Sequence, residues 1–238
     1  MVKSRRIKCS IIVLTLFVLQ QMQAQDVVEG QAAIYMNTAS HFAALYSGNC
    51  QQPLGFRTVN HQYFKERNYV SGKLSYNGIV YTDVMLRWDL YRDEILLLSP
   101  VSSNIVLIND YIDFAEIHGY RIIYLHPDGL PGCPAAGNYI MLYSGKNLLL
   151  EKLSNSPNVA DLDGKRYTYK FLLSSHFYFK KDDVYHKIKN SGKLLKILDT
   201  HKKELKQYTR AHNYKYKRDA EKMLTEIIKE HEKLSNYE

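Results

Sequence analysis

The stretch YVSGKLSYNGIVYTDVMLRW, residues 69–88, decides the fold. Two runs rich in β-branched and aromatic residues, Tyr69–Tyr76 and Ile79–Trp88, lie on either side of Asn77-Gly78. Asn-Gly between such runs is the strongest short-range signal of a β-hairpin, because both residues tolerate the positive φ of a two-residue turn. The alternation along the second run predicts one shared face for Val80, Thr82, Val84, Leu86 and Trp88.

Short runs of the same kind continue along the chain. They predict strands at Glu94–Leu98, Asn104–Ile108, Ile112–Ile117, Tyr120–Leu125, Asn138–Ser144, Asn147–Leu153, Tyr167–Leu173 and His176–Phe179. The Pro- and Gly-rich residues His126–Gly137 and the polar residues Ser154–Gly164 predict exposed loops. Regular short strands with tight turns indicate a curved antiparallel sheet, an open barrel or a sandwich.

The apolar period changes from strand to helix at Ser191. In the last segment apolar side chains recur every three or four residues, at Tyr216, Ala220, Met223, Leu224, Ile227, Ile228, His231 and Leu234. A shorter helix before it places Leu198, His201, Leu205 and Tyr208 on one side. Both helices are expected to pack on the sheet or, less simply, on a partner.

The first residues have the three parts of a secretory signal. Lys3, Arg5, Arg6 and Lys8 give a positive start, Ile11–Leu19 is apolar, and Met22-Gln23-Ala24 offers a cleavage site. A membrane-spanning helix needs roughly 20 apolar residues, about twice this run. We therefore expect a signal peptide over 1–24, no transmembrane segment after its removal, and a mature protein that is periplasmic or secreted.

The chain thus divides into three parts. After the leader, residues 25–185 form a β-rich domain with a short N-terminal helix over Ala39–Tyr46, and residues 186–238 form basic amphipathic C-terminal helices. The predicted fold class is α+β, mainly antiparallel β, with the C-terminal helices packed on the sheet.

Two cysteines, Cys50 and Cys133, remain after the leader is removed. In an oxidising compartment they can form a disulfide that closes a long loop, which would stabilise the fold by roughly 3–5 kcal/mol. Free cysteines are also common as small buried apolar groups, so the sequence leaves both states open.

Positive charge gathers toward the C-terminus. Residues 151–238 carry 20 Lys and Arg against 13 Asp and Glu. Within them, Arg210, Lys215, Lys217 and Arg218 alternate with aromatic residues, a pattern that can bind anions. An exported protein rarely meets nucleic acid, so an anionic glycan or a lipid surface is the expected target. The plainer alternative is a helix junction with solvated cations.

No catalytic, metal or cofactor motif is present in the sequence. It lacks a Gly-x-Ser-x-Gly elbow, a phosphate-binding glycine loop and the His-Glu-x-x-His motif, and its nine histidines have no metal-ligand spacing. The front half holds several acids that a glycosidase would need as a pair, but strand ends and turns use Asp in the same places. These acids are Asp83, Asp89, Asp93, Glu94, Asp110, Asp113 and Glu116.

Several segments resemble one known family. They are Leu45–Gly48, Asn60–Phe64, Gly72–Val84, Arg87–Glu94 and Gly137–Tyr139, followed by the Lys-rich helical end. With these segments the chain resembles a family of uncharacterised secreted proteins from Bacteroidetes, although Trp88 stands where that family more often has tyrosine. The resemblance implies export, a β-rich fold and a helical end. No activity is established for the family, so it implies no catalytic residues.

Three functional hypotheses follow from the sequence. The first is a non-enzymatic cell-envelope protein that serves interaction or assembly, with another envelope protein as partner. The second is a periplasmic carrier that holds a lipid or apolar ligand in a curved β-sheet. The third is an uncharted glycan hydrolase, which would need several of the acids above to converge in one cleft.

Overall fold

The computed structural model describes residues 44–163 and 166–235. Contacts divide the chain into one unit that ends at Ser47 and a second unit that begins at Gly48. Ala44 and Leu45 are helical, in agreement with the short helix predicted over Ala39–Tyr46. The rest of that helix, the signal peptide over 1–24 and residues 236–238 lie outside the described residues.

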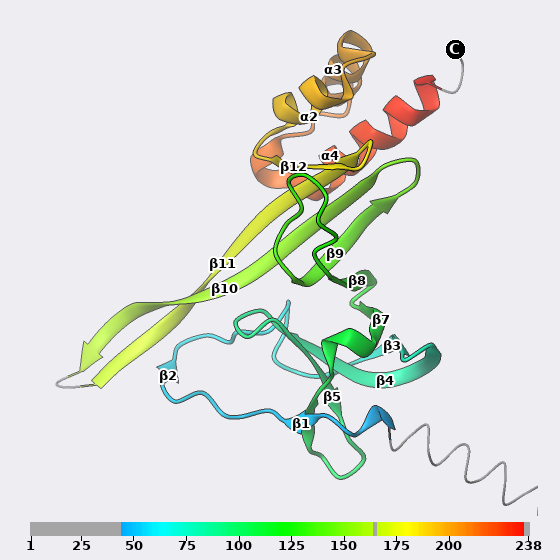
Figure 1. Cartoon of the computed structure of the whole chain (residues 1–238). Coiled ribbons are helices and arrows are strands. Elements are labelled where there is room, and N and C mark those ends of the chain that lie inside the picture. Colours follow the sequence, from blue (N-terminus) through cyan, green and yellow to red (C-terminus); the bar gives the residue numbers. More distant parts are fainter. Residues whose placement is uncertain (1–43, 164–165, 236–238) are drawn as a thin grey trace, which may run out of the picture. The chain divides into compact units, whose positions relative to one another are not determined.

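The described residues of the second unit contain one sheet of twelve strands (Figure 1). The strands are β1 (Asn49–Cys50), β2 (Arg57–Thr58), β3 (Val70–Tyr76), β4 (Ile79–Asp89), β5 (Glu94–Leu98), β6 (Asn104–Val106), β7 (Ile112–Ile117), β8 (Tyr120–Leu125), β9 (Gly137–Ser144), β10 (Leu148–Asp163), β11 (Arg166–Lys181) and β12 (Val184–Ile188). A 3₁₀ helix, Asn109–Tyr111, joins β6 to β7, so β6 ends before the predicted Ile108.

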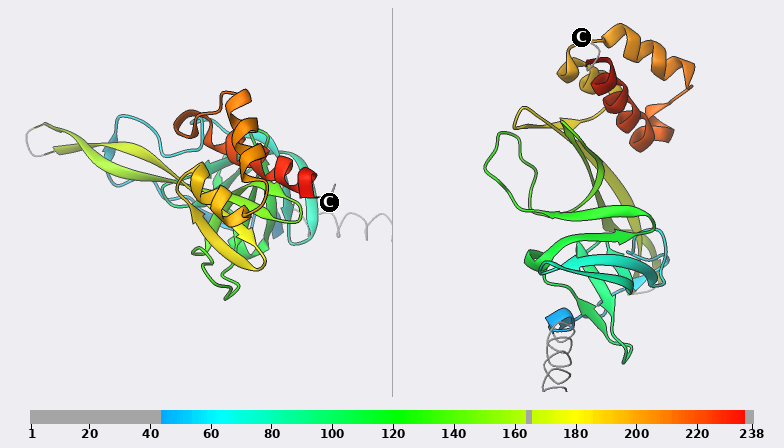
Figure 2. Two further views of the ribbon diagram at one scale, coloured as in Figure 1. Left: turned by 90° about the horizontal axis from the view of Figure 1, so that it is seen from above. Right: turned by 90° about the vertical axis from the view of Figure 1, so that its right-hand side faces the viewer.

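The sheet is mostly antiparallel, curved and unclosed, which confirms the predicted fold class (Figure 2). Its strands follow the order β1-β6-β5-β4-β3-β7-β8-β9-β10-β11-β12. β2 pairs with β11 in parallel, and the strand pairs along the order are antiparallel. Within the described part of the chain, no pairing joins β1 to β12.

The Asn77-Gly78 hairpin forms as predicted. The two residues have φ values of 52° and 74°, the left-handed conformations that a tight hairpin turn requires. The carboxylate of Asp113 on β7 fixes the turn, because its Oδ2 accepts hydrogen bonds from the Gly78 N–H at 3.1 Å and the Ser75 hydroxyl at 2.8 Å.

The single face predicted for β4 is wrong, because a β-bulge interrupts the strand. Thr82 and Asp83 lie between Tyr81 and Val84, where β3 has only Lys73. Asp83 takes a φ of 57°, and the extra residue shifts the alternation by one position. Leu86 and Trp88 are both buried, but nearer the turn Tyr81 is buried and Val80 is 52% exposed.

The predicted loop over Ser154–Gly164 is also wrong, because β10 continues to Asp163. Its partner β11 is likewise continuous across the two strands predicted at Tyr167–Leu173 and His176–Phe179. β9 pairs with β10 only at Leu148–Glu151, so the rest of β10 lies at a sheet edge. At an edge, polar residues face water and Pro157 costs no ladder hydrogen bond, which explains a strand with a loop-like sequence.

Three helices complete the described chain: α2 (Ser191–Leu198), α3 (Lys202–Ala211) and α4 (Tyr216–Ser235). The Asn190 side chain caps α2 by accepting a hydrogen bond from the Lys193 N–H. Asp199 and His201 then adopt left-handed conformations, with φ of 65° and 52°, and divide the shorter predicted helix into α2 and α3. The long predicted helix is α4, with a non-helical residue at Asp219.

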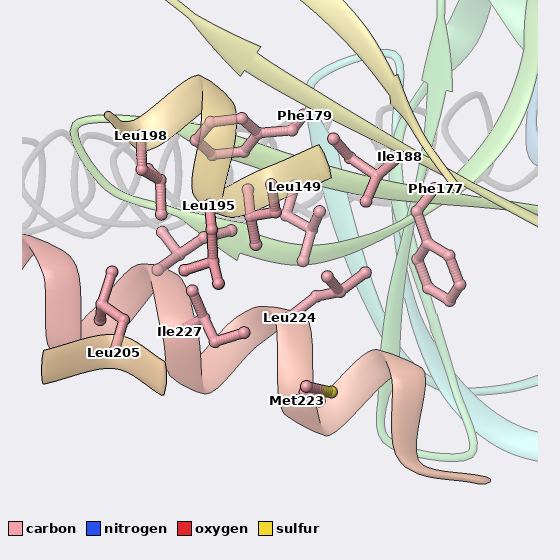
Figure 3. Packing of buried hydrophobic residues seen from close by; sticks show 12 residues of the cluster. Leu149, Phe177, Phe179, Ile188, Leu195, Leu198, Leu205, Met223, Leu224 and Ile227 are labelled. Carbon is pink, nitrogen blue, oxygen red and sulfur yellow. The ribbon is translucent and has the colours of Figure 1, made fainter. Parts of the chain in front are cut away.

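The helices pack on the sheet, as predicted (Figures 1 and 3). They cover the part of β10 and β11 that is farthest from the turn of this hairpin, next to β9 and β12. The cluster between them consists of Leu149, Phe177, Phe179, Ile188, Leu194, Leu195, Leu198, Leu205, Met223, Leu224, Ile227 and Ile228. Burying a side chain of this size contributes about 1.5–3 kcal/mol. The helical end is therefore part of the same folded unit as the sheet.

Candidate functional site

A cavity of about 1360 Å³ lies on one face of the β10–β11 hairpin, beside the helices. We call it the hairpin groove. Besides the two strands, it is bordered by residues 60–65, Leu90, residues 187–189 and the start of α4 at residues 216–222. Small-molecule pockets usually measure about 300–1,000 Å³, so the groove has room for a longer ligand.

The floor of the groove follows from the strand register. Glu151 lies opposite Phe177 and Leu153 lies opposite Ser175. Residues directly opposite each other share a face of the sheet. These side chains therefore continue the face that carries Leu149 and Phe179 beneath the helices. The apolar core of the helical end thus passes directly into the floor of the groove.

Glu151 is the most unusual residue of the floor. It is 2% exposed, and its Oε1 accepts a hydrogen bond from the Ser175 hydroxyl at 2.5 Å. Its Oε2 has no hydrogen-bond partner among the described residues. Burial raises the pKa of Glu151 to about 7; the Ser175 hydrogen bond opposes this shift and the charge of Glu221 adds to it. Near neutral pH the group can donate or accept a hydrogen bond.

Basic side chains dominate the border of the groove. They are Lys65, Lys187, Lys189, Lys217, Arg218 and Lys222, against the acids Glu151, Asp219 and Glu221. Asp219 is already engaged, since it forms an ion pair with Arg218 at 2.8 Å. Glu221 accepts a hydrogen bond from the Tyr120 hydroxyl at 3.2 Å. The border therefore carries an excess of positive charge that attracts anionic groups.

Residues 60–65 are held in place by their side chains. The Asn60 amide accepts a hydrogen bond from the Phe171 N–H at 2.7 Å and donates one to the Phe171 carbonyl at 2.9 Å. Gln62 donates to the carboxylate of Asp89, which is fully buried and also accepts from the Tyr91 and Arg92 N–H groups. This wall of the groove is therefore fixed before a ligand arrives.

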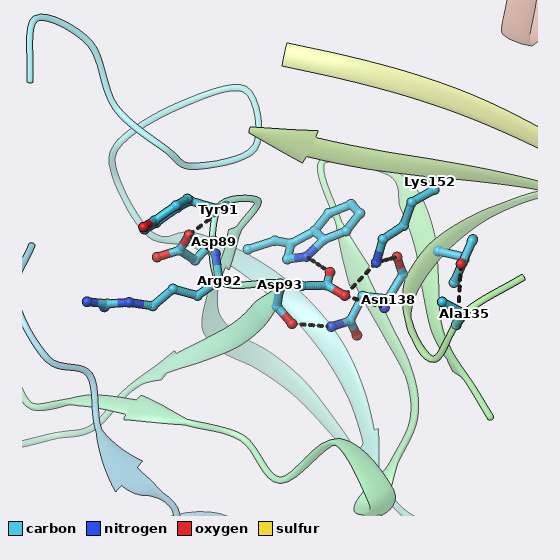
Figure 4. A network of polar contacts seen from close by, with 9 residues as sticks. Asp89, Tyr91, Arg92, Asp93, Ala135, Asn138 and Lys152 are labelled. Carbon is cyan, nitrogen blue, oxygen red and sulfur yellow. Dashed lines mark hydrogen bonds and ion pairs between the residues drawn. The ribbon is translucent and has the colours of Figure 1, made fainter. Parts of the chain in front are cut away.

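Asp93 has a structural role of the same kind (Figure 4). Its carboxylate forms an ion pair with Lys152 at 2.5 Å and accepts hydrogen bonds from the Asn138 N–H and the Trp88 indole N–H. The network joins the β4–β5 turn to β9 and β10. Asp89 and Asp93 thus act as structural carboxylates. None of the seven acids considered for a glycosidase lines the hairpin groove.

The predicted anion-binding residues do not all lie together. Lys217 and Arg218 belong to the first turn of α4 and line the hairpin groove. Arg210 lies on α3 and Lys215 just before α4; both are exposed and neither borders the groove. The sequence alone missed the other four basic residues of the border: Lys222, also in α4, and Lys65, Lys187 and Lys189, which belong to distant segments.

Cys50 and Cys133, for which the sequence left both a disulfide and free thiols open, are free thiols in the structure. Cys50 is exposed on β1, which begins the strand order. Cys133 is partly buried against Tyr139, Leu150 and Tyr185, whose strands lie toward the other end of that order. A disulfide would need the two Cα atoms within about 7 Å.

Sequence reasoning also missed Glu151, although a signal for it exists. Leu149, Glu151 and Leu153 occupy alternate positions of one strand, so a charged residue stands where the pattern requires an inward side chain. A lone inward carboxylate in such a pattern indicates either a buried polar network or a binding site.

Among the described residues, no helix is both long and apolar enough to cross a membrane. The same residues contain no cluster of His, Cys, Asp or Glu side chains that could hold a metal ion.

No protein-family model, characterised protein or solved structure matches the chain. The resemblance to secreted Bacteroidetes proteins therefore stays a prediction.

Proposed function

We propose that this protein is exported to the periplasm or secreted and acts there as a non-enzymatic interaction module, with the hairpin groove as its binding site. Export rests on the leader over 1–24. The interaction role rests on one observation above all, a preformed groove with a basic border and a buried carboxyl group whose Oε2 lacks a partner in the described chain.

The partner that this groove fits is an acidic segment of another envelope polypeptide. The cations of the border are spread over three segments, so they favour an extended anionic ligand over a single small anion. Lys189, Lys217 and Lys222 are exposed and form no ion pair with another described residue. They remain available for carboxylates of a partner.

The groove gives less support to the lipid-carrier hypothesis. A carrier needs apolar surface that its cargo can cover. Leu153, Phe171, Phe177 and Ile188 line the groove, but each is at most 6% exposed, so Leu173, at 63% exposed, is the main aliphatic side chain of the groove that a cargo could cover. The glycan-hydrolase hypothesis is weakened because the acids that motivated it lie outside the groove. A polypeptide ligand, which uses charge and hydrogen bonds more than apolar area, fits the surface better.

Selection from a displayed library of random heptapeptides tests this proposal. We expect binders in which Asp and Glu outnumber Lys and Arg, and fluorescence anisotropy should show that their affinity falls as salt is raised. The triple variant K189E/K217E/K222E should weaken binding at least tenfold, which corresponds to about 1.4 kcal/mol.

The matched control is K203E/K206E/R210E, which makes the same charge change on exposed residues of α3. It should leave the affinity within about twofold, since Debye screening confines charge effects to about 8–10 Å. Neutral or basic binders, or equal losses in the two triple variants, would refute binding of an acidic segment in the groove.

A further inference from the structure

The two edges of β11 are occupied differently. One edge pairs with β10 along nearly the whole strand, from Arg166 to Lys180. The other edge pairs with two separate short strands: β2 at Thr168–Tyr169 and β12 at Phe177–Lys181. Between these partners, the described residues contain no strand that covers this edge of β11.

The uncovered stretch has its polar backbone groups directed outward. In an antiparallel strand, successive residues direct their N–H and C=O groups to opposite edges. The Tyr169 carbonyl bonds to the Val59 N–H, and both backbone groups of Phe171 bond to the Asn60 side chain. By this alternation, the N–H and C=O groups of Leu173 and Ser175 face the same edge, where no described strand meets them.

Exposure agrees with this assignment. Residues 172–176 are all exposed, although they lie in the middle of a long strand, and Leu173 is 63% exposed. Phe171 and Phe177, at the two ends of the stretch, are 3% and 6% exposed. Leu173, Ser175 and His176 line the hairpin groove, so the open edge lies within the proposed binding site.

We infer that the acidic partner segment adds to the sheet as a short β-strand, on the open edge of β11 between β2 and β12, where it pairs with Leu173 and Ser175. The inference rests on the proposed function and specifies how that site holds its ligand. Addition of an extended peptide to an exposed sheet edge is a general mode of recognition, in which backbone hydrogen bonds supply affinity and side-chain contacts supply specificity.

The length of the open edge sets the length of the added strand. From Phe171 to Phe177 the strand advances about 20 Å at roughly 3.3 Å per residue. The Asn60 amide closes one end and Ile188 of β12 closes the other. A paired segment of about three to five residues fits between them, and the peptide then leaves the sheet beside the basic border.

The added strand also has a defined chemical surrounding. Lys187 and Lys189 flank the Ile188 end of the open edge. Alternate side chains of the peptide share a face with Ser175, and this is the face that carries Glu151. A carboxylate at the Ile188 end of the paired segment therefore meets Lys187 and Lys189, while the middle of the segment lies over the floor.

Alternate N-methylation of the selected acidic heptapeptide tests the backbone pairing. Only every second N–H of an added strand points at β11, so methylating that set should weaken binding at least tenfold. Methylating the other set should leave binding within about twofold. In parallel, NMR amide exchange on the complex should show at least tenfold slower exchange of the Leu173 and Ser175 N–H groups than in the free protein.

The L173P variant gives a second test, because proline removes an N–H that faces the open edge and leaves the pairing with β10 in place. Peptide binding should weaken in L173P and persist in L173A, and the amide spectrum of each variant reports whether it is folded. The N-methylated peptides decide the matter if L173P does not fold.

These experiments separate the binding mode from the proposed function. If the peptide binds and loses affinity in K189E/K217E/K222E, but both methylated sets bind equally well and the two amides stay unprotected, strand addition is refuted and the acidic-ligand function stands. If no acidic peptide binds, the proposed function itself fails. If the two amides are protected without peptide in a concentration-dependent dimer, the occupant is a second copy and the inference is overturned.

Discussion

Glu151 shows how a single buried carboxyl links the stability of the fold to the proposed site. Burial beside Phe177 and Leu153 raises the pKa of Glu151 to about 7, and Ser175 engages only one of its oxygens. An apolar residue at this position would pack without that cost. Retaining a carboxyl at the floor of a groove is typical of binding sites, where the free oxygen awaits a donor from the ligand.

Replacement of Glu151 by Gln should change how stability depends on pH. In the folded state the pKa of Glu151 is about 7, above its ordinary value of 4.5, so the folded protein binds the extra proton. The favourable contribution of this group is complete below about pH 4.5 and is lost as pH rises through 7. Between acidic and alkaline pH, this contribution to the free energy of unfolding should fall by about 3 kcal/mol.

Urea unfolding of the wild type and E151Q at pH 5 and pH 8 measures this effect, because subtraction removes the titration of other groups. E151Q should gain stability relative to the wild type at pH 8 and much less at pH 5. An equal difference at both values would contradict the raised pKa of Glu151.

Asp93 should be far more sensitive to substitution than its partial exposure suggests. In D93A, Lys152, Asn138 and the Trp88 indole all lose an acceptor, and we expect a loss of about 2–4 kcal/mol in the free energy of unfolding. The control is K229A, which removes only an exposed helix pair with Glu226 and should cost less than about 0.5 kcal/mol. Comparable losses in the two variants would argue against the network.

At the scale of elements, close backbone packing fixes β3 between β4 and β7. A Cβ atom added to Gly72 would lie 2.4 Å from the Glu116 carbonyl oxygen on β7, a distance that no relaxed structure allows. G72A should therefore destabilise the protein by about 2–3 kcal/mol through strain in the sheet. The measurement is thermal unfolding of G72A and of the control G55A. The control should be nearly neutral, because no atom lies within 4 Å of its added Cβ.

The helical end should weaken in acid because of His231 on α4. This residue is 8% exposed and shares a hydrogen bond with the Thr200 hydroxyl at 2.8 Å. Burial lowers the pKa of His231, and the neighbouring His201 and Lys181 add to the shift, while Glu232 opposes it. The contribution of His231 to the free energy of unfolding is therefore fully present above the ordinary histidine pKa of about 6.5, and it is lost as pH falls below that value.

The measurement is the melting temperature of the wild type and H231N between pH 7.5 and pH 5. The wild type should lose more stability than H231N over this range, because Asn cannot take up a proton. Parallel curves for the two proteins would show that His231 does not titrate as its burial requires.

For the whole molecule, the sequence predicts those elements whose signals are local. β5, β7 and β8 coincide with their predicted ranges, because short apolar runs end at clear turns. The outer half of β10 could not be predicted, since its polar sequence is stable as a strand only through pairing with β11. The bulge at Asp83 depends likewise on how β3 and β4 fit together.

The position and lining of the hairpin groove could not be predicted from the sequence. Its walls come from residues 60–65, 187–189 and 216–222, and its floor from two strands, so only the folded chain brings them together. From the sequence, Lys217 and Arg218 were recognised as cations near aromatic residues, but nothing local links them to Glu151. Charge composition indicated an anionic target without indicating where it binds.

Site-specific photo-crosslinking tests the central claim, that the groove binds an acidic polypeptide segment, most directly. A benzophenone amino acid would replace Leu173 in the groove or, as a control, Val101, which is 82% exposed in the turn between β5 and β6. After irradiation with an envelope extract, mass spectrometry should identify a peptide richer in Asp and Glu than in Lys and Arg, crosslinked at position 173 only and lost in K189E/K217E/K222E. Absence of an adduct at position 173, adducts with basic peptides, or equal yields at positions 173 and 101 would contradict the account.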